Sequence, residues 1–339
     1  MPRLGLQRAT LRRKGLRVRI AFVVWTRFDR HSELLARQLG AEMHFIYCGQ
    51  QGSVLQAPLR YALQALRTWQ TLSRDRPDVV FVQNPPIFAV LVTLVYSRCY
   101  GARYFISSHS AAFLSPKWRW SIGLQRALSR RAAATIVHNR YQERIIAAWG
   151  CPHCVLGFIP GSYPPGEHTT LPAQFNAAVI SSAAEDEPLS VVFKAAASLP
   201  EVDFYVTGDS TRLSSQLLAN KPGNCRLTGF LSYDRYIGLL RAVDVIVDLT
   251  TRDDTLLCGA IEAVSIGKPL VLSDWPILRE CFPLGAVHVQ NSVEDLLRGI
   301  RESQRDHAAL QRDILRLHEQ LCAEWDRKLG ELQRILGAG

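Results

Sequence analysis

The chain has 339 residues, of which 47% are hydrophobic and 21% are charged. This apolar content supports a sizeable core, which excludes a disordered chain, and the length suggests about two domains. The longest apolar run, from Ile87 to Tyr96, is about half of what a membrane-spanning helix requires, so we do not expect an integral membrane protein. Eight cysteines without a dense framework favour a reducing compartment, and we therefore expect a cytoplasmic protein.

The net charge of +10 is unevenly distributed along the chain. Residues 1–168 carry 23 Lys/Arg against 7 Asp/Glu, a net charge of +16, whereas residues 169–339 carry 17 against 23, a net charge of −6. We infer two domains with different partners, the first of which attracts a phosphate-rich surface or an anionic acceptor. A nucleic-acid partner is not expected, because no zinc-finger, RNA-binding or helix-turn-helix pattern is present and the second half is acidic.

After a basic tail at residues 1–16, strand and helix patterns alternate through a first domain at residues 17–163. The helical patterns end at Leu39, where Gly40 stops the helix, and at Ser73, Tyr100 and Trp149. Apolar runs predict strands at Val18–Trp25, Glu42–Cys48, Val79–Val82, Arg103–Ser107 and Thr135–His138. The alternation is typical of an α/β fold with a doubly wound parallel sheet.

The segment Lys117–Arg131 interleaves tryptophans and aliphatic residues with five Lys/Arg. One interpretation is a helix with one buried face and one solvated basic face. The other is a surface that rests on anionic lipid headgroups, with Trp118 and Trp120 at the interface. The first is favoured, and the second would place the protein at the inner face of the cytoplasmic membrane as a peripheral protein.

Residues 164–175 are rich in Pro, Gly and Thr and are expected to be a linker. A second alternating series follows at residues 176–309. Its predicted strands are Ala177–Ile180, Val202–Thr207, Arg226–Thr228, Val243–Leu249, Leu270–Leu272 and Ala286–Val289. Residues 310–339 form a long helical stretch, which we expect to cross back to the first domain.

The stretch Asp254–Asp274 is predicted to be a loop, a helix, a turn and a buried strand. Asp254 and Thr255 are residue types that cap helix N-termini, so we expect the helix to begin there, and Gly267 is suited to the left-handed position that ends it. A loop at the carboxyl end of a strand and the start of a helix is where open α/β sheets bind ligands, and the helix amides favour an anion such as phosphate.

Several motifs together resemble the GT-B glycosyltransferases, in particular the retaining, nucleotide-sugar-dependent family 4 type. Asp254 and Glu262-Ala263, followed by Gly267-Lys268-Pro269, match that family's two acids separated by seven residues and its Gly-x-Pro turn. Gly229-Phe230 and Ala242-Val243-Asp244 are similar to the run that precedes them. The resemblance covers nearly the whole chain from about Arg17. It implies two Rossmann-like doubly wound domains that face each other across a cleft.

The resemblance also implies roles for individual residues. Glu262 would bind the ribose hydroxyls, Asp254 would contact the donor sugar, and the amides of Thr255 and Leu256 would lie near the sugar hydroxyls or the diphosphate. His109, at the end of a first-domain strand, would face the transferring sugar. Charge separation between the diphosphate and the sugar calls for donors at the phosphate and acceptors at the sugar.

Two departures from the family pattern stand out. Asp254 replaces the usual Glu, and the loop Ser181–Glu187 lacks the Arg and Lys that hold the diphosphate in the family. The remaining candidates to hold it are cations elsewhere or amides at helix starts. The cations are Arg27, Arg30, Arg252 and Arg212, the last in the loop that begins at Gly208.

We therefore expect a hexosyltransferase-type enzyme that moves a sugar from a nucleoside diphosphate to a saccharide or lipid-linked saccharide, in polysaccharide or glycoconjugate biosynthesis. No cofactor is expected, and no metal, because there is no Asp-x-Asp motif at a loop. A nucleotide-sugar epimerase of the same architecture and a non-catalytic sugar-nucleotide-binding protein remain as alternatives. A dinucleotide oxidoreductase is disfavoured because no G-x-G-x-x-G follows a strand.

Overall fold

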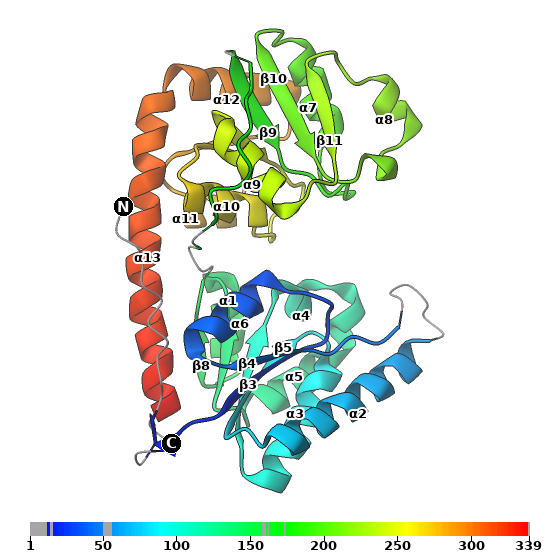
Figure 1. Ribbon diagram of the computed structural model, residues 1–339, viewed down its shortest axis with the longest axis vertical. Helices are drawn as coiled ribbons and strands as arrows, with labels where there is room; N and C mark the ends of the chain where they lie inside the picture. Colours follow the sequence, from blue (N-terminus) through cyan, green and yellow to red (C-terminus); the bar gives the residue numbers. More distant parts are fainter. Residues whose placement is uncertain are drawn as a thin grey trace. The chain divides into compact units, whose positions relative to one another are not determined.

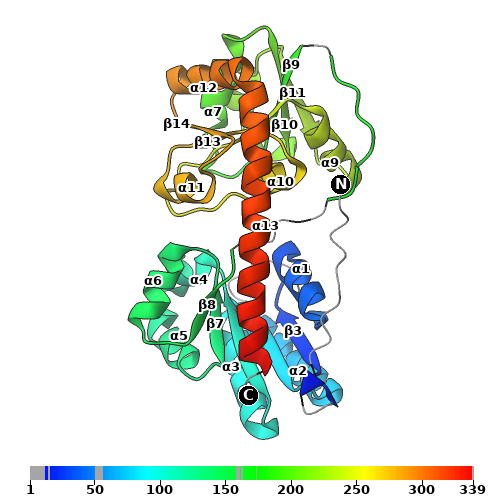
Figure 2. The same cartoon turned by 90° about the vertical axis from the view of Figure 1, so that its left-hand side faces the viewer.

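The computed structural model describes residues 12–13, 16–49, 56–157, 161, 163–172 and 174–337, with side chains from Val18 onward apart from that of Arg30 (Figures 1 and 2). The chain divides into two compact units. Unit 1 comprises Met1–Ile159 and Glu324–Gly339, and unit 2 comprises Pro160–Ala323. Across the described ranges, no helix has the length and apolar character needed to cross a lipid bilayer.

Unit 1 is built on a six-stranded parallel sheet with the strand order β4-β3-β5-β6-β7-β8. The residues of β3, β5 and β7 are all buried, as expected for strands covered on both faces. The prediction of a doubly wound sheet is confirmed. The edge strand β8 is an addition to the five predicted strands. The strands are β3 (Ile20–Val24), β4 (Glu42–Phe45), β5 (Val79–Asn84), β6 (Arg103–Ser108), β7 (Ala134–Val137) and β8 (His153–Val155).

Helices cover both faces of this sheet. On one face α1 packs together with the end of the C-terminal helix, and on the other face α2, α3, η1 and α5 share one core cluster. Gly40 ends α1 with φ 63°, the left-handed conformation predicted from the sequence. The helices are α1 (Arg30–Leu39), α2 (Ala57–Asp75), α3 (Ile87–Tyr100), α4 (Ser110–Leu114), η1 (Pro116–Ser121), α5 (Ile122–Ser129) and α6 (Arg140–Ala148).

Part of the predicted basic tail has regular backbone structure. Arg12–Arg13 (β1) pairs antiparallel with Leu16–Arg17 (β2) to form a two-stranded sheet of its own. Residues 1–11 of the tail lie outside the described residues.

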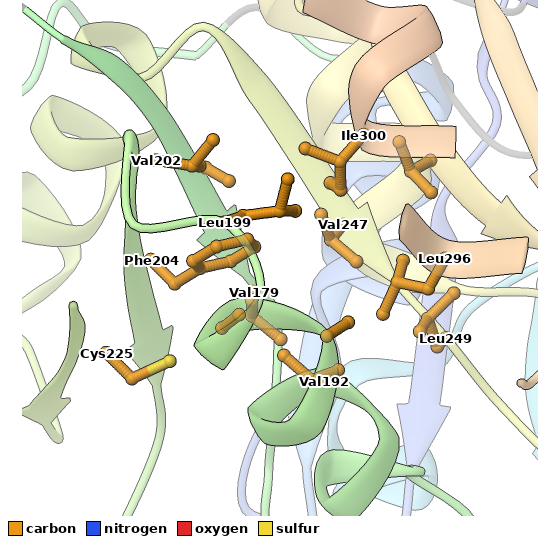
Figure 3. Packing of buried hydrophobic residues seen from close by; sticks show 14 of the residues in the cluster. Val179, Val192, Leu199, Val202, Phe204, Cys225, Val247, Leu249, Leu296 and Ile300 are labelled. Carbon is orange, nitrogen blue, oxygen red and sulfur yellow. The ribbon is translucent and has the colours of Figure 1, made fainter. Parts of the chain in front are cut away.

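Unit 2 has a second six-stranded parallel sheet, with the order β11-β10-β9-β12-β13-β14. The six predicted strands are all present. The sheet core includes Val179, Phe204 and Val247, against which Val192 and Ile300 pack from two helices (Figure 3). The strands are β9 (Phe175–Val179), β10 (Val202–Thr207), β11 (Cys225–Gly229), β12 (Val245–Asp248), β13 (Leu270–Ser273) and β14 (Ala286–Val289).

The helices of unit 2 also form two layers. Helices α7 and α12 lie on one face of the sheet, and α9, α10, α11 and the start of α13 lie on the other. The helices are η2 (Ser210–Arg212), α7 (Leu189–Ala197), α8 (Ser215–Ala219), α9 (Tyr233–Ala242), α10 (Cys258–Ile266), α11 (Pro276–Cys281), α12 (Val293–Arg305) and α13 (His307–Gly337).

The described part of the predicted linker packs closely along α9. Glu167 donates its backbone N–H to Asp234 O at 2.9 Å, and Arg241 donates to Tyr163 O and Pro164 O. A Cβ on Gly238 would lie 1.9 Å from Glu167 O, so this contact requires glycine. The segment is therefore an integral part of unit 2.

Helix α13 belongs to both units, as Figure 2 shows in red. Its first turns bury Ile314 and Leu317 in the core of unit 2. Its last turns bury Trp325, Leu332 and Leu336 in the core of unit 1. Each unit therefore depends on this helix to cover part of its sheet.

Candidate functional site

Both sheets have a switch point, where the chain reverses the direction in which it adds strands. In unit 1 the switch lies between β3 and β5, and in unit 2 it lies between β9 and β12. Open parallel sheets bind ligands outside the carboxyl ends of the strands at such points. Polar residues gather at both positions, so each unit has its own candidate site.

In unit 1 three histidines that follow three different strands lie together at this edge of the sheet. His31 follows β3, His109 follows β6 and His138 follows β7. The ring centroid of His138 lies 4.5 Å from that of His31 and 4.8 Å from that of His109. Gln83, near the end of β5, donates to Asp29 Oδ2 at 3.1 Å and lies 3.1 Å from His109 Nε2.

All three imidazoles are neutral at pH 7. Burial lowers the pKa of His31 and His109, and it lowers the pKa of His138 to about 3. His138 Nδ1 lies 2.9 Å from Leu156 O, so Nδ1 carries the proton. The amide of Gln83 donates to His109 Nε2, so the proton of His109 is on Nδ1. Neutral rings of this kind exchange hydrogen bonds with hydroxyl groups and add no charge.

A buried network fixes the backbone around His109. Its N–H donates to Asn84 O at 2.8 Å, and the Asn84 side chain donates to Ser108 Oγ and Gln125 Oε1. Gln142 donates to Ser110 Oγ at 2.7 Å. The turn from β6 into α4 is thus held on both sides, which restricts the position of the His109 ring.

The first loop of unit 1 contributes two candidate arginines, Arg27 and Arg30. The Arg27 guanidinium lies 4.8 Å from the centroid of the Tyr47 ring, in a cation–π contact at the exposed surface. The side chain of Arg30 lies outside the described residues. Both remain predicted donor-binding residues.

In unit 2 the predicted start of the motif helix is wrong. Helix α10 begins at Cys258 rather than at Asp254 or Thr255, and Asp254 lies in a turn where Thr255 Oγ1 donates to it at 3.3 Å. The physical reason is the cap. The buried carboxyl of Asp248, at the end of β12, accepts the N–H groups of Gly259 and Ala260. A residue ten positions upstream of the helix therefore supplies what Asp254 was expected to supply.

This cap also changes the expectation of an anion site at the start of α10. Two of the first amides already serve Asp248, and a Cβ on Gly259 would lie 2.5 Å from Asp248 Oδ2. Burial and the nearby carboxylates of Glu262 and Glu187 raise the pKa of Asp248 to about 8. Asp248 is therefore protonated at neutral pH, and the described segment 255–257 precedes the helix as irregular chain.

Glu262 lies in the second turn of α10, at the same edge of the sheet. Tyr236 of α9 donates its hydroxyl to Glu262 Oε2 at 2.6 Å. Burial, with the Glu262 carboxylate beside it, raises the pKa of Tyr236 well above its usual value, so the phenol remains a donor. Tyr236 thereby holds one oxygen of Glu262.

The loop Ser181–Glu187, which follows β9, is closed on itself. Ser181 Oγ donates to Glu187 Oε2 at 2.6 Å, and the N–H groups of Ser182 and Ala184 donate to the same carboxylate. Ala183 has φ 58°, which turns the neighbouring amides inward. The loop forms an anion-binding nest, and its occupant is the side chain of Glu187.

Two of the candidate cations lie at this loop. Arg212 Nη1 donates to Ser182 O at 2.8 Å, and Arg252 forms an ion pair with Asp186 at 3.3 Å. Gly208, with φ 96°, would place a Cβ 2.2 Å from Ser181 O, so close contact between the two loops requires glycine there. Positive charge thus reaches the switch point from neighbouring loops.

Among the described residues, one group of potential metal ligands occurs on β4 and at the end of α2. Glu42 and His44 on β4 and Asp75 at the end of α2 have ligand atoms within 4.8 Å of one another. Arg74 donates to Asp75 at 2.7 Å, and His44 Nε2 lies 3.5 Å from Asp75. Asp75 of this group forms an ion pair with Arg74, and the group lies away from the carboxyl ends of the strands that form the switch point of unit 1.

Models of known protein families match both halves of the chain. A family model described as a Glycosyl transferase 4-like domain matches residues 3–160, and one described as Glycosyl transferase-like matches residues 190–327. No curated protein sequence matches the chain at a significant level. A solved structure of a sucrose-phosphate synthase from Thermosynechococcus elongatus is similar to this chain, with a TM-score of 0.72 and 14% sequence identity. The match covers 95% of this chain and 100% of the synthase chain.

Two further solved structures show the same similarity. HepE from Anabaena, in complex with UDP and glucose, has a TM-score of 0.69 at 14% identity and covers 93% of this chain and 99% of its own. A glycosyltransferase from Rickettsia africae has a TM-score of 0.69 at 13% identity and covers 95% of this chain and 99% of its own.

Two parallel six-stranded sheets with helices on both faces define the GT-B class of glycosyltransferase. The two family-model matches together span most of the chain, one in each half. The protein belongs to the family 4-like glycosyltransferases, and the predicted fold and family are confirmed.

Several residues at these sites were not predicted. Folding brings each of them to its site from a separate part of the sequence. In unit 1 they are His31 and His138, and in unit 2 they are Tyr236, Asp248 and Glu187. The one local signal was Asp248, an acid at the end of an otherwise apolar run.

Proposed function

We propose that the protein transfers a hexosyl group from a nucleoside diphosphate sugar to a saccharide or lipid-linked saccharide acceptor, with retention, in polysaccharide or glycoconjugate biosynthesis. The observation that carries the proposal is the switch point of unit 2, where Glu262, oriented by Tyr236, and Arg212 at the Ser181 loop lie at the carboxyl edge of the sheet. The related structure of Anabaena HepE was solved with UDP-glucose, which supports a donor of this class.

In this proposal unit 2 binds the donor. One Glu262 oxygen accepts the phenol of Tyr236, and the carboxylate also accepts ribose hydroxyls. Asp254, with the amides of Thr255 and Leu256, contacts the donor sugar or the diphosphate. Arg212 supplies positive charge to the diphosphate, in place of the cations that the Ser181 loop lacks.

Unit 1 contributes the histidine cluster and the acceptor site. His109 accepts or donates a hydrogen bond at a hydroxyl of the transferring sugar, and its neutral state leaves the positive charge of the transition state to the sugar itself. The acceptor oxygen forms a bond to the anomeric carbon as the bond to the diphosphate breaks. The acceptor proton passes to the leaving phosphate oxygen, so no paired carboxylates of the hydrolase type are needed.

The test begins with a thermal-shift panel of UDP-, GDP-, ADP- and CMP-sugars on the wild type and the Glu262→Ala variant. We expect one nucleotide class to stabilise the wild type and the variant to lose that shift. An unchanged shift in the variant would remove Glu262 from the site. The protein is then incubated with the stabilising donor and candidate saccharides.

The products separate the three candidate functions. Release of nucleoside diphosphate with a new glycoside of the donor's anomeric configuration, read by NMR, is the expected result. An isomerised nucleotide sugar formed without an acceptor would identify an epimerase. Donor binding without turnover on any acceptor would support a non-catalytic sugar-nucleotide-binding protein.

A further inference from the structure

Helix α2 exposes a stripe of leucines that nothing in unit 1 covers within the described residues. Leu59, Leu63 and Leu66 recur at helical spacing and therefore share one face, and they are 65%, 43% and 54% exposed. The opposite face of α2 buries Leu72, with Gln64 and Thr68, toward the sheet. A contiguous exposed apolar stripe of this kind marks an interaction surface.

An exposed tryptophan extends the apolar surface beyond α2. Trp120 of η1 is 63% exposed, and its ring centroid lies 6.1 Å from that of Phe88 on α3. The Phe88 ring in turn lies 4.9 Å from that of Tyr61, which lies on the core-facing side of α2. Figure 1 shows α2 and α3 running side by side on unit 1. Because α2, α3 and η1 cover the same face of the sheet, the exposed leucines and Trp120 belong to one side of the unit.

The same layer of helices is strongly basic. Residues 57–75, 87–100 and 116–131 contain nine Lys/Arg and a single acid, Asp75, which is largely buried and pairs with Arg74. All of these cations except Arg60 are exposed. We call this surface the basic apolar face. Its cations are Arg60, Arg67, Arg74, Arg98, Lys117, Arg119, Arg126, Arg130 and Arg131.

We propose that the basic apolar face docks onto an anionic lipid surface, with Leu59, Leu63, Leu66 and Trp120 inserted among the headgroups. Lys and Arg around an apolar stripe are the pattern of helices that lie in the membrane interface, and tryptophan is favoured there. Nucleic acid would contact the cations but leave the leucines exposed to water. The expectation for Lys117–Arg131 is thereby extended to α2. Docking is independent of the identity of the donor.

The test is co-sedimentation with vesicles in the absence of any nucleotide sugar. We expect the wild type to bind vesicles containing about one-third phosphatidylglycerol at least about tenfold more tightly than phosphatidylcholine vesicles, with a loss of affinity as salt increases. The variant Leu59→Ser/Leu63→Ser/Leu66→Ser should lose at least about tenfold in affinity. Phe230→Ser is the matched control, because Phe230 is 89% exposed in unit 2, and it should bind like the wild type.

The charge contribution is tested separately. Arg67→Glu/Arg119→Glu should lose most of the preference for anionic vesicles, whereas Arg301→Glu, an exposed change in unit 2, should retain it. Brominated lipids should quench part of the tryptophan fluorescence of the wild type, and Trp120→Phe should remove that part. This second readout does not depend on whether the leucine variant folds.

Three results would overturn the proposal. The first is equal vesicle binding by the wild type and the leucine variant. The second is binding to duplex DNA as tight as to anionic vesicles. The third is a wild-type dimer that the leucine variant abolishes, which would make the stripe an interface between copies. The thermal shift with a nucleotide sugar should be the same in the leucine variant, so the donor site is judged independently.

Discussion

Substituting Asp248 by Asn should change how the stability of the protein depends on pH. The pKa of Asp248 is about 8 in the folded protein against 3.8 for a free aspartate side chain. The folded state therefore holds a proton that the unfolded chain releases, and stability falls as pH rises from about 4 to about 8. Between pH 6 and pH 8 this loss amounts to about 2 kcal/mol, because stability falls by up to about 1.4 kcal/mol per pH unit while the folded carboxyl keeps its proton. Asn reproduces the protonated carboxyl and does not titrate.

Thermal unfolding of the wild type and Asp248→Asn between pH 5 and pH 9 measures this difference. The wild-type midpoint should drop by roughly 5 °C more than that of the variant between pH 6 and pH 8. Asp306→Asn is the control, because the Asp306 side chain is only partly buried and its hydrogen bond with Arg305 lowers its pKa, so its slope over this range should match the wild type. Equal slopes for Asp248→Asn and the wild type would refute the protonated, buried carboxyl.

Three further changes test the candidate sites. Tyr236→Phe removes the bond to Glu262 and should weaken nucleotide-sugar binding by roughly tenfold or more, measured by calorimetry; unaltered affinity would deny Tyr236 its positioning role. His109→Ala should slow transfer by about 100-fold or more while the thermal shift with nucleotide persists, and a variant that transfers normally would exclude His109. Arg212→Ala should weaken binding of the nucleoside diphosphate by roughly tenfold and leave the free nucleoside unaffected, so an equal loss for both ligands would argue against a phosphate contact.

Features with a local cause were predictable from the sequence. Gly40 and Gly267 end their helices with φ 63° and 73°, because a left-handed residue after a helix is a local requirement that glycine meets at little cost. The alternation of apolar strand patterns and helical patterns likewise predicted both sheets. The three-residue strand β8 was missed because so short a segment carries little periodicity.

The candidate sites depend on contacts that sequence patterns do not encode. The start of α10 was misplaced because its cap, Asp248, comes from the preceding strand and not from the residues beside the helix. His31 and His138 join His109 only once three strands have aligned their carboxyl ends. The motif acids Asp254 and Glu262 were identifiable by spacing, but the partner of Glu262, Tyr236, lies on another helix.

The last turns of helix α13 belong to unit 1 but follow unit 2 in the sequence, and this affects the order in which the two units can fold. The greater part of unit 1 is synthesised before unit 2, yet Trp325, Leu332 and Leu336, which complete its core, are made after the whole of unit 2. Until then one face of its sheet lacks part of its cover, whereas unit 2 is complete in sequence by Ala323. The unit made second can therefore finish folding first. A fragment that ends at Ile159 lacks these three core residues, so the functional halves of this enzyme are not separable by a single cut in the chain.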